Sequence, residues 1–179
     1  SEMADFENSI KVNSVIGKDD VSISNRDNRR GVAGIFFVFK VAGAAADEML
    51  PLEEVTRIAQ KAADRVHTMG VALSPCTIPR VGHPSFELGE NEMEIGMGIH
   101  GEAGIRRGQM ASADEIVDEM MKPILDDADL GNGDEVAVLM NGLGATPLEE
   151  QYIAYKRVHD ILTSRGIGIF HVYAGEFAT

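Results

Sequence analysis

The chain has 179 residues, of which 44% are hydrophobic and 25% charged, and its formal net charge is −13. This length suits one domain of ordinary size, and no stretch holds the ~18 uninterrupted apolar residues of a membrane span. The acidic excess argues against a general nucleic-acid surface, which needs clustered lysine and arginine. The one basic cluster, residues 26–30 (RDNRR), contains an aspartate, so we interpret it as a loop or interface feature.

Cysteine usage and the first residues favour a reducing compartment. Cys76 is the only cysteine, so no internal disulfide can form, which fits the cytoplasm. Residues 1–10 (SEMADFENSI) carry acids where a signal peptide has lysines before an apolar core. Because Cys76 follows an apolar strand pattern, a buried structural thiol is favoured over a nucleophile. We therefore expect a cytoplasmic protein.

The first part of the chain predicts two strands and two helices. Residues 10–16 (IKVNSVI) alternate and are rich in β-branched side chains, as strands are. Residues 34–49 lack alternation, and their AGAAA segment favours a buried helix over a buried strand. Residues 52–69 predict an amphipathic helix between a proline and a glycine, and residues 71–78 predict a strand. The apolar face of that helix comprises Leu52, Val55, Ile58, Ala59, Ala62 and Val66.

The middle of the chain contains more turn-forming prolines and glycines. Residues 79–92 contain two prolines and two glycines and predict a loop, and residues 93–100 predict the next strand. Residues 112–130 predict a helix, because its opening serine is followed three residues later by glutamate, the signature of a capping box.

The last segments complete an alternation of helices with apolar strands. Residues 133–147 predict a turn, a strand and a glycine-bearing exit, and residues 167–175 predict the final strand. Between them residues 148–166 predict a helix. Its expected inward side chains are Ile153, Val158, Ile161 and Leu162. This alternation predicts an α/β domain with a mixed sheet layered with helices.

The segment MNGLGATP (residues 140–147) lies between a predicted strand and helix, where α/β folds place ligand loops. It matches neither glycine-rich nucleotide motif, so the chain offers no evident ATP site. Gly142 and Gly144 let the chain turn tightly, and Thr146 is a candidate helix cap with Pro147 at the first helical position. We favour this structural role over direct ligand contact.

Histidine spacing does not support a metal site. The histidines are His67, His83, His100, His159 and His171, and no two have the helical spacing of zinc ligands. We expect His67 and His159 on helix surfaces, His83 in a solvated turn and His171 within the last strand.

His100 is the candidate functional residue, because it ends the predicted strand 93–100 and is followed by a glycine-rich turn and Glu102. Such edges put a side chain into a crevice with little steric cover. A neutral imidazole nitrogen can attack a carbonyl carbon and hold a small ketone as a hemiaminal, provided that the other nitrogen is fixed as a donor. The residues alone leave this role and a purely structural one open.

Six segments, by their order and spacing, resemble the dihydroxyacetone-binding subunit of dihydroxyacetone kinases. They are NRRGVAG, VAGAAA, MGVALSPCTIP, GHPSFELGENEMEIGMGIHGEAGIRR, SADEIVDEM and GDEVAVLMNGLGATPLEEQY. The likeness runs almost continuously from Arg29 to Thr179. It implies the mixed α/β fold of that subunit's second domain.

The resemblance also implies a role for His100 and a set of partners. In that family the histidine of the GIHGE segment, here His100, forms a covalent hemiaminal with dihydroxyacetone, which glycerol cannot do because it lacks a carbonyl. A separate nucleotide-binding subunit or domain phosphorylates the bound sugar, using free ATP or a bound ADP that phosphoenolpyruvate-dependent phosphocarriers recharge. We therefore expect a homodimer that itself binds no cofactor or metal, with ATP or ADP and magnesium on the partner subunit.

The chain departs from the family in ways that make it resemble a fragment. A GGGSGHEP-like segment with a second histidine, and an aspartate thought to be the base, belong to the family's first half and have no counterpart here. We assign residues 1–28 to a remnant of the preceding domain and linker, and residues 29–179 to the histidine-bearing α/β domain. Ala103 replaces a proline common in the family but leaves His100 in register. We expect this piece alone to be inactive.

Two other functions remain open from the sequence. A regulatory paralogue would bind dihydroxyacetone without phosphorylating it and would control a transcription factor. A plain α/β scaffold would use His100 only to satisfy a backbone carbonyl.

Overall fold

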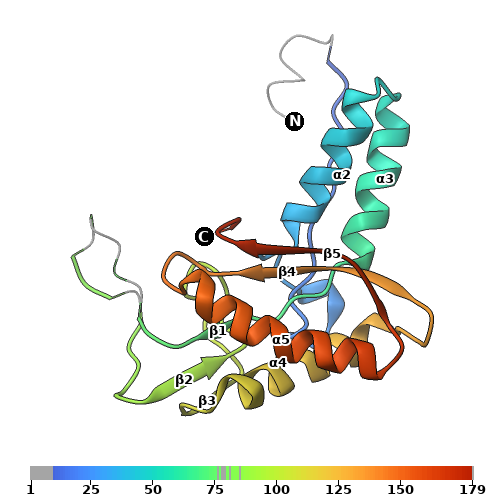
Figure 1. The fold of residues 1–179 in the computed structure, drawn as a ribbon. Coiled ribbons are helices and arrows are strands. Elements are labelled where there is room, and N and C mark those ends of the chain that lie inside the picture. The colour runs from blue at the N-terminus through green and yellow to red at the C-terminus, as the bar shows by residue number, and fades with distance from the viewer. Residues whose placement is uncertain (1–9, 76, 78–79, 81, 85, 179) are drawn as a thin grey trace.

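The computed structural model describes residues 10–75, 77, 80, 82–84 and 86–178. They form a body containing two small sheets, from which a helical hairpin projects (Figure 1). In chain order the elements are η1 (Arg26–Asn28), α2 (Ile35–Asp47), α3 (Leu52–Arg65), β1 (Val71–Ala72), β2 (Glu92–Ile95), β3 (Arg106–Gln109), α4 (Ala113–Ala128), β4 (Glu135–Asn141), α5 (Leu148–Ser164) and β5 (Gly168–Gly175). Among these residues no helix has the length and apolar content needed to cross a bilayer.

The C-terminal part of the body is a β–α–β unit. Strands β4 and β5 pair in parallel, and α5 connects them and packs against β5. The core beneath them comprises Val117, Met121, Leu125, Val158, Leu162 and Ile167. The helices expected at 112–130 and 148–166 and the strands expected within 133–147 and 167–175 are confirmed. Ile153 is the exception within the predicted inward set, because 57% of it is exposed.

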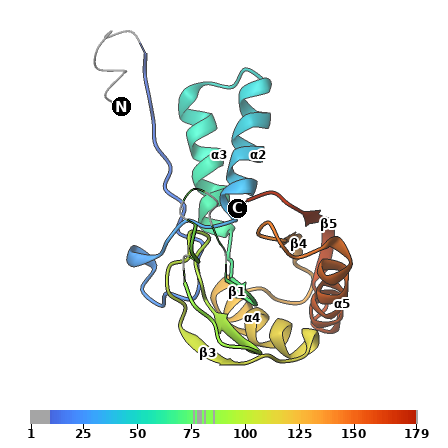
Figure 2. The ribbon, with the colours of Figure 1, turned by 90° about the vertical axis from the view of Figure 1, so that its left-hand side faces the viewer.

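Strands β1, β2 and β3 form a separate antiparallel sheet in that order. Its core comprises Val21, Met69, Met93, Ile95 and Ile116. Helix α4 lies between the two sheets and contributes side chains to both cores (Figure 2). The α/β class is confirmed, with the strands divided between an antiparallel and a parallel sheet.

Strand β3 was not predicted. Its sequence, RRGQ, has no apolar side chain, and the strand is largely exposed. Pairing with β2 and ion pairs hold it in place: Arg107 bonds Glu94 at 2.7 Å, and Arg106 bonds Glu119 on α4. A pattern search for apolar periodicity cannot detect a strand of this kind.

Helix α2 forms where residues 34–49 predicted a helix, but the expectation that it is buried is wrong. Its only buried residue is Ala45, and Phe39 is 69% exposed. The reason is that α2 packs mainly against α3, and the two stand away from the body as a hairpin (Figure 1). Helix α3 buries Ala59 and Ala63 against it and ends at Arg65, four residues earlier than expected.

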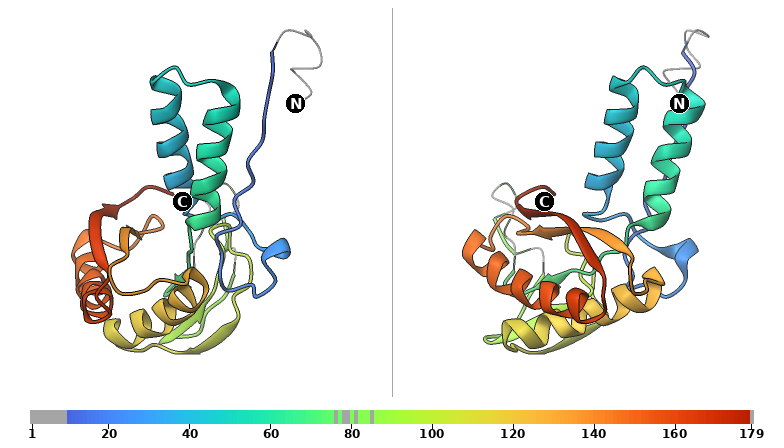
Figure 3. Two further views of the ribbon diagram at one scale, coloured as in Figure 1. Left: turned by 90° about the vertical axis from the view of Figure 1, so that its right-hand side faces the viewer. Right: turned by 45° about the vertical axis from the view of Figure 1, so that its right-hand side comes forward.

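Three predicted strands differ from the structure. Residues 10–16 run as an extended segment beside the hairpin and pair with no described strand (Figure 3). The strand expected over 71–78 is reduced to Val71–Ala72, and residues 79–92 form the expected loop as far as they are described, with Glu92 already in β2. The strand expected over 93–100 ends at Ile95, because Gly96 turns the backbone with a φ of +80°. The predicted burial of Cys76 lies outside the described residues.

Candidate functional site

His100 lies at the tip of a turn that follows β2, here called the His100 turn (residues 96–104). Residues 93–98 are buried, whereas His100 is exposed. The backbone N–H of Gly98 donates to the carbonyl of Glu102 at 3.0 Å, and the N–H of Gly101 donates to the carbonyl of Gly98 at 3.1 Å. These bonds close the turn that carries the imidazole.

Glu102 contacts His100 through both carboxylate oxygens. Oε1 lies 3.2 Å from Nδ1 of the imidazole, and Oε2 accepts the backbone N–H of His100 at 3.0 Å. Because a carboxylate accepts hydrogen bonds, Nδ1 carries the proton, and the lone pair of the neutral ring is on Nε2. Nε2 has no hydrogen-bond partner among the described residues, and 76% of the side chain is exposed.

The charge of Glu102 is stabilised at this position. Burial favours the neutral acid and would raise the pKa of Glu102. Hydrogen bonds from its own backbone N–H and from the backbone and ring of His100 outweigh that effect, and the pKa is lowered. Glu102 is therefore an ionised acceptor at neutral pH that fixes the donor tautomer of His100.

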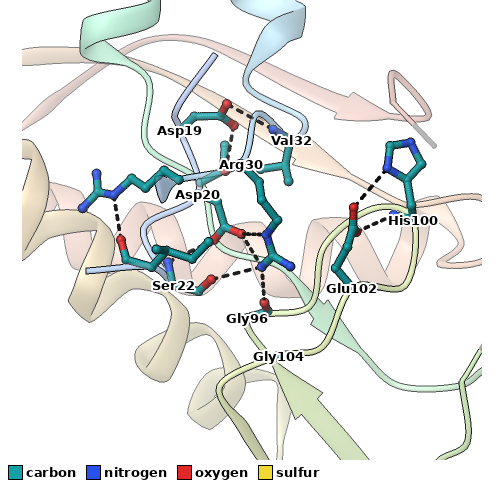
Figure 4. Close-up of polar contacts among 12 residues, drawn as sticks. Asp19, Asp20, Ser22, Arg30, Val32, Gly96, His100, Glu102 and Gly104 are labelled. Carbon is teal, nitrogen blue, oxygen red and sulfur yellow. Dashed lines mark hydrogen bonds and ion pairs between the residues drawn. The ribbon is translucent and has the colours of Figure 1, made fainter. Parts of the chain in front are cut away.

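A buried ion pair lies on the other side of the His100 turn (Figure 4). The carboxylate of Asp20 accepts from Nε of Arg30 at 2.8 Å and from Nη2 at 2.5 Å. Nη2 also donates to the carbonyl of Gly96 at 3.0 Å. The neighbouring Asp19 is equally buried and accepts the backbone N–H groups of Val32 and Gly34.

The basic segment 26–30 has the structural role expected for a loop feature. Each of its three arginines has an acidic partner. They are Arg26 with Asp64, Arg29 with Asp127, and Arg30 with Asp20. The Arg29 fork is bidentate at 2.7 Å on both oxygens, and this hydrogen bonding lowers the pKa of Asp127 from 3.8 to about 2.

The other histidines have no comparable arrangement. His67 was expected on a helix surface, but it follows the end of α3 at Arg65, and only 11% of its side chain is exposed, with its Nδ1 2.8 Å from the carboxylate of Asp127. His83 is in an exposed turn, His159 is exposed on α5, and His171 lies in β5, all as expected. Within the part of the chain that the structure describes, no three histidine, cysteine or acidic side chains converge as a metal site requires.

The second glycine-bearing segment is here called the NGLG loop (residues 141–147). Its polar groups bond the C-terminal segment and the start of α5. Asn141 bonds the backbone of the C-terminal segment, and the carboxylate of Glu176 accepts the N–H of Gly144 at 2.6 Å. Thr146 does not cap α5 with its side chain: Pro147 is the N-cap, and the Thr146 carbonyl accepts from the buried Gln151 amide at 2.8 Å. The polar groups of this loop serve its closure.

A surface groove of about 500 Å³ lies between α4 and α5, away from His100. Its walls mix apolar side chains, such as Met121 and Leu125, with paired charges, such as Arg157 and Asp118. No residue of the His100 turn lines it. The crevice expected around His100 is therefore not closed by the described residues.

Sequence reasoning found His100 and its neighbour Glu102 but did not detect the Asp20–Arg30 pair beneath them. The signal available was the pair of consecutive acids, Asp19 and Asp20, directly before a core valine. Two adjacent carboxylates at the edge of a core require buried donors, and the nearby arginines are suitable candidates.

Comparisons with known proteins identify relatives of this chain. The chain is 46% identical over 180 residues to the dihydroxyacetone-binding subunit DhaK of PTS-dependent dihydroxyacetone kinase 2 from Listeria innocua, covering 100% of this chain and 54% of that protein. Its structure is similar to the dihydroxyacetone kinase operon co-activator Dha-DhaQ, with a TM-score of 0.90, 30% identity, and coverage of 99% of this chain and 56% of the other. The dihydroxyacetone kinase of C. freundii gives a TM-score of 0.80 and 31% identity over 93% of this chain and 30% of its own.

The extent of these matches defines the family. The chain spans about half the length of the curated relatives it matches. The model of the Dak1 domain matches residues 1–179. The resemblance to the dihydroxyacetone-binding subunits of dihydroxyacetone kinases is thus confirmed, and the chain belongs to the Dak1 domain family.

Proposed function

We propose that this chain is the dihydroxyacetone-binding part of a dihydroxyacetone kinase and that His100 holds the ketone covalently. The observation that carries the proposal is the pairing at the tip of the His100 turn. Nδ1 of the imidazole is 3.2 Å from Glu102, whereas Nε2 is exposed and has no partner among the described residues. A ring fixed in this way offers a lone pair to an electrophilic carbon.

The bond changes of the proposed step balance without a cofactor. Nε2 of His100 donates its lone pair to the carbonyl carbon of dihydroxyacetone, and the π electrons of the C=O bond move to its oxygen. That oxygen takes a proton from solvent, and the proton on Nδ1 passes through the Glu102 carboxylate to solvent. One proton enters and one leaves, so the ring stays neutral and Glu102 stays ionised. The product is a hemiaminal, and no water leaves. Glycerol has no carbonyl group and cannot form this bond.

The remainder of the longer protein is expected to complete the site. The His100 side chain is 76% exposed, and no described residue hydrogen-bonds its free nitrogen. A substrate-sized ligand is normally enclosed over most of its surface. We therefore assign the remaining walls, and the base that activates the sugar hydroxyl, to the half of the protein that lies outside this chain. The phosphoryl group would come from a nucleotide-bearing subunit, and the assembly would be a homodimer.

The test is retention of dihydroxyacetone by the full-length protein. Radiolabelled dihydroxyacetone is added, the protein is separated by gel filtration, and its mass is measured under native conditions. The wild-type protein should gain the whole mass of the sugar, and glycerol should give no gain. His100→Asn should abolish retention, whereas the matched control His159→Asn, at an exposed histidine on α5, should retain the sugar fully. Equal retention by His100→Asn would disprove the covalent role.

A second function is favoured by one specific comparison. The structure has a TM-score of 0.90 to a protein described as an operon co-activator. A regulatory protein of that kind would retain dihydroxyacetone on His100 but would not pass it to a kinase. Adding a nucleotide-bearing kinase subunit and magnesium separates the two functions: formation of the phosphorylated sugar supports the kinase, and retention without product supports the regulator.

A further inference from the structure

We propose that Arg30 is a positioning residue that sets the geometry of the His100 turn. The inference rests on the proposed function of His100 and adds a residue 70 positions earlier in the chain. Figure 4 shows the guanidinium of Arg30 between the carboxylate of Asp20 and the carbonyl of Gly96.

The ion pair is fixed from several directions. Asp20 is 2% exposed, and one of its oxygens accepts the backbone N–H of Ser22 at 3.0 Å. The other oxygen accepts both Nε and Nη2 of Arg30. The backbone N–H of Asp20 in turn donates to the carbonyl of Arg30 at 3.2 Å. These bonds to Asp20 fix the plane of the Arg30 guanidinium independently of the His100 turn.

The guanidinium then contacts one backbone position that precedes His100, Gly96, and lies close to a second, Gly98. Nη2 donates to the carbonyl of Gly96 at 3.0 Å, where the chain leaves β2 with a positive φ. A Cβ atom placed on Gly98 would stand 3.0 Å from Nη1 of Arg30 and would overlap the carboxylate of Glu102. The Arg30 guanidinium and the Glu102 carboxylate therefore both lie close to Gly98, and Glu102 bonds the imidazole.

A positioning role explains why a charged pair is present here. A buried ion pair is weak evidence for stability, because desolvation cancels most of the attraction between the charges. Placement of a reacting group, in contrast, requires a tolerance of about 0.5 Å. Since Glu102, which hydrogen-bonds the imidazole ring, belongs to the same turn, the position of Nε2 depends on the backbone of the turn. Arg30 is the side chain that fixes where that backbone starts.

The experiment compares two adjacent arginines in the full-length protein. Arg30→Lys keeps a positive charge beside Asp20 but loses the planar fork that reaches Asp20 and Gly96 together. Arg29→Lys makes the same change at the residue that bonds Asp127 instead. Dihydroxyacetone occupancy per folded molecule is measured by native mass spectrometry, the folded fraction by thermal unfolding, and the tautomer of His100 by the ¹⁵N shifts of its ring.

The two variants should behave in opposite ways. Arg30→Lys should lower the affinity for dihydroxyacetone about tenfold and mix the Nδ1–H and Nε2–H tautomers of His100. Arg29→Lys should lower the unfolding temperature and leave both affinity and tautomer unchanged. If Arg30→Lys does not fold, the double variant Asp20→Asn/Arg30→Gln, which leaves no unpaired buried charge, should fold and show the same loss of affinity.

Unchanged affinity and tautomer in folded Arg30→Lys, or in the double variant, would overturn the positioning role while leaving the function of His100 intact. Loss of affinity in proportion to loss of stability at both arginines would also overturn it, because it indicates a structural role. If the wild-type protein retains no dihydroxyacetone, the proposed function fails and this inference fails with it.

Discussion

The His100 turn and the NGLG loop are both glycine-bearing segments that follow a strand, yet they use their polar groups differently. In the NGLG loop, Asn141, Gly144 and Gln151 are engaged within the loop, its flanks and the C-terminal segment. In the His100 turn, Glu102 bonds the backbone N–H of His100 and Nδ1 of its imidazole, and Nε2 has no hydrogen-bond partner among the described residues.

This difference separates a functional turn from a structural one more clearly than glycine content does. Each segment donates a backbone N–H to a carboxylate: Gly144 to Glu176 of the C-terminal segment, and His100 to Glu102. What differs is whether the segment carries an exposed side chain with a ring nitrogen that has no hydrogen-bond partner. Only the His100 turn has one among the described residues of the two segments, and we expect substitutions in the two to separate stability from binding.

Gly142→Ala should produce the largest loss of stability, about 3 kcal/mol, which is the upper end for forcing atoms into a filled site. An added Cβ would stand 2.8 Å from the carbonyl oxygen of Thr146 and would overlap the side chains of Gln151 and Glu176. Urea unfolding measures the loss, and dihydroxyacetone occupancy per folded molecule should not change. The counterpart Gly98→Ala overlaps mainly the flexible end of Glu102 and should lower occupancy more than stability. The reverse ranking would contradict the distinction between the two segments.

Acid should weaken the contact between Arg29 and helix α4. The pKa of Asp127 is lowered from 3.8 to about 2, so its ion pair stabilises the fold fully above pH 3.8 and is lost as the pH falls through 2. A shift of this size corresponds to about 2 kcal/mol at neutral pH. Urea titrations from pH 6 to pH 2 should show Asp127→Asn less stable at pH 6, with the difference from wild type shrinking below pH 4. A constant difference at every pH would show that the carboxylate charge contributes nothing.

The smallest changes in stability are expected when Glu176 or Glu102, the carboxylates that bond the two segments, is replaced by glutamine. Glu176→Gln should cost about 1 kcal/mol, because a charge-assisted bond to the Gly144 N–H becomes a neutral one. Glu102→Gln should cost less than about 0.5 kcal/mol, because the side chain is 43% exposed. Dihydroxyacetone occupancy should show the opposite order and fall severalfold only in Glu102→Gln. Equal occupancy in both variants would remove Glu102 from the binding site.

The parts of the fold that local pattern predicted correctly are those whose residues lie close together in the chain. The Ser112 capping box forms as expected, with the serine oxygen and the Glu115 carboxylate exchanging bonds with each other's backbone. Helix α5 and its two flanking strands also agree, because their apolar periodicity matches a core that they build together. An error occurs where a segment has a strand-like pattern but no neighbouring strand to pair with: residues 10–16 alternate like a strand but join no described sheet.

The candidate site divides in the same way. His100 and Glu102 are two residues apart, and their pairing is a property of one turn, so the sequence alone could indicate the chemistry. The contact of Arg30 with Gly96 spans 66 residues, and no periodicity reports it.

Sequence by itself therefore determined the family and most helices and singled out His100 as the candidate residue, because these depend on local order along the chain. Tertiary structure alone decided that α2 is exposed, that a strand without apolar side chains completes the antiparallel sheet, and that a half-buried arginine bonds the backbone at the start of the His100 turn. The physical reason is that burial and ion pairing depend on which distant segments meet, and those meetings are fixed only when the whole chain packs.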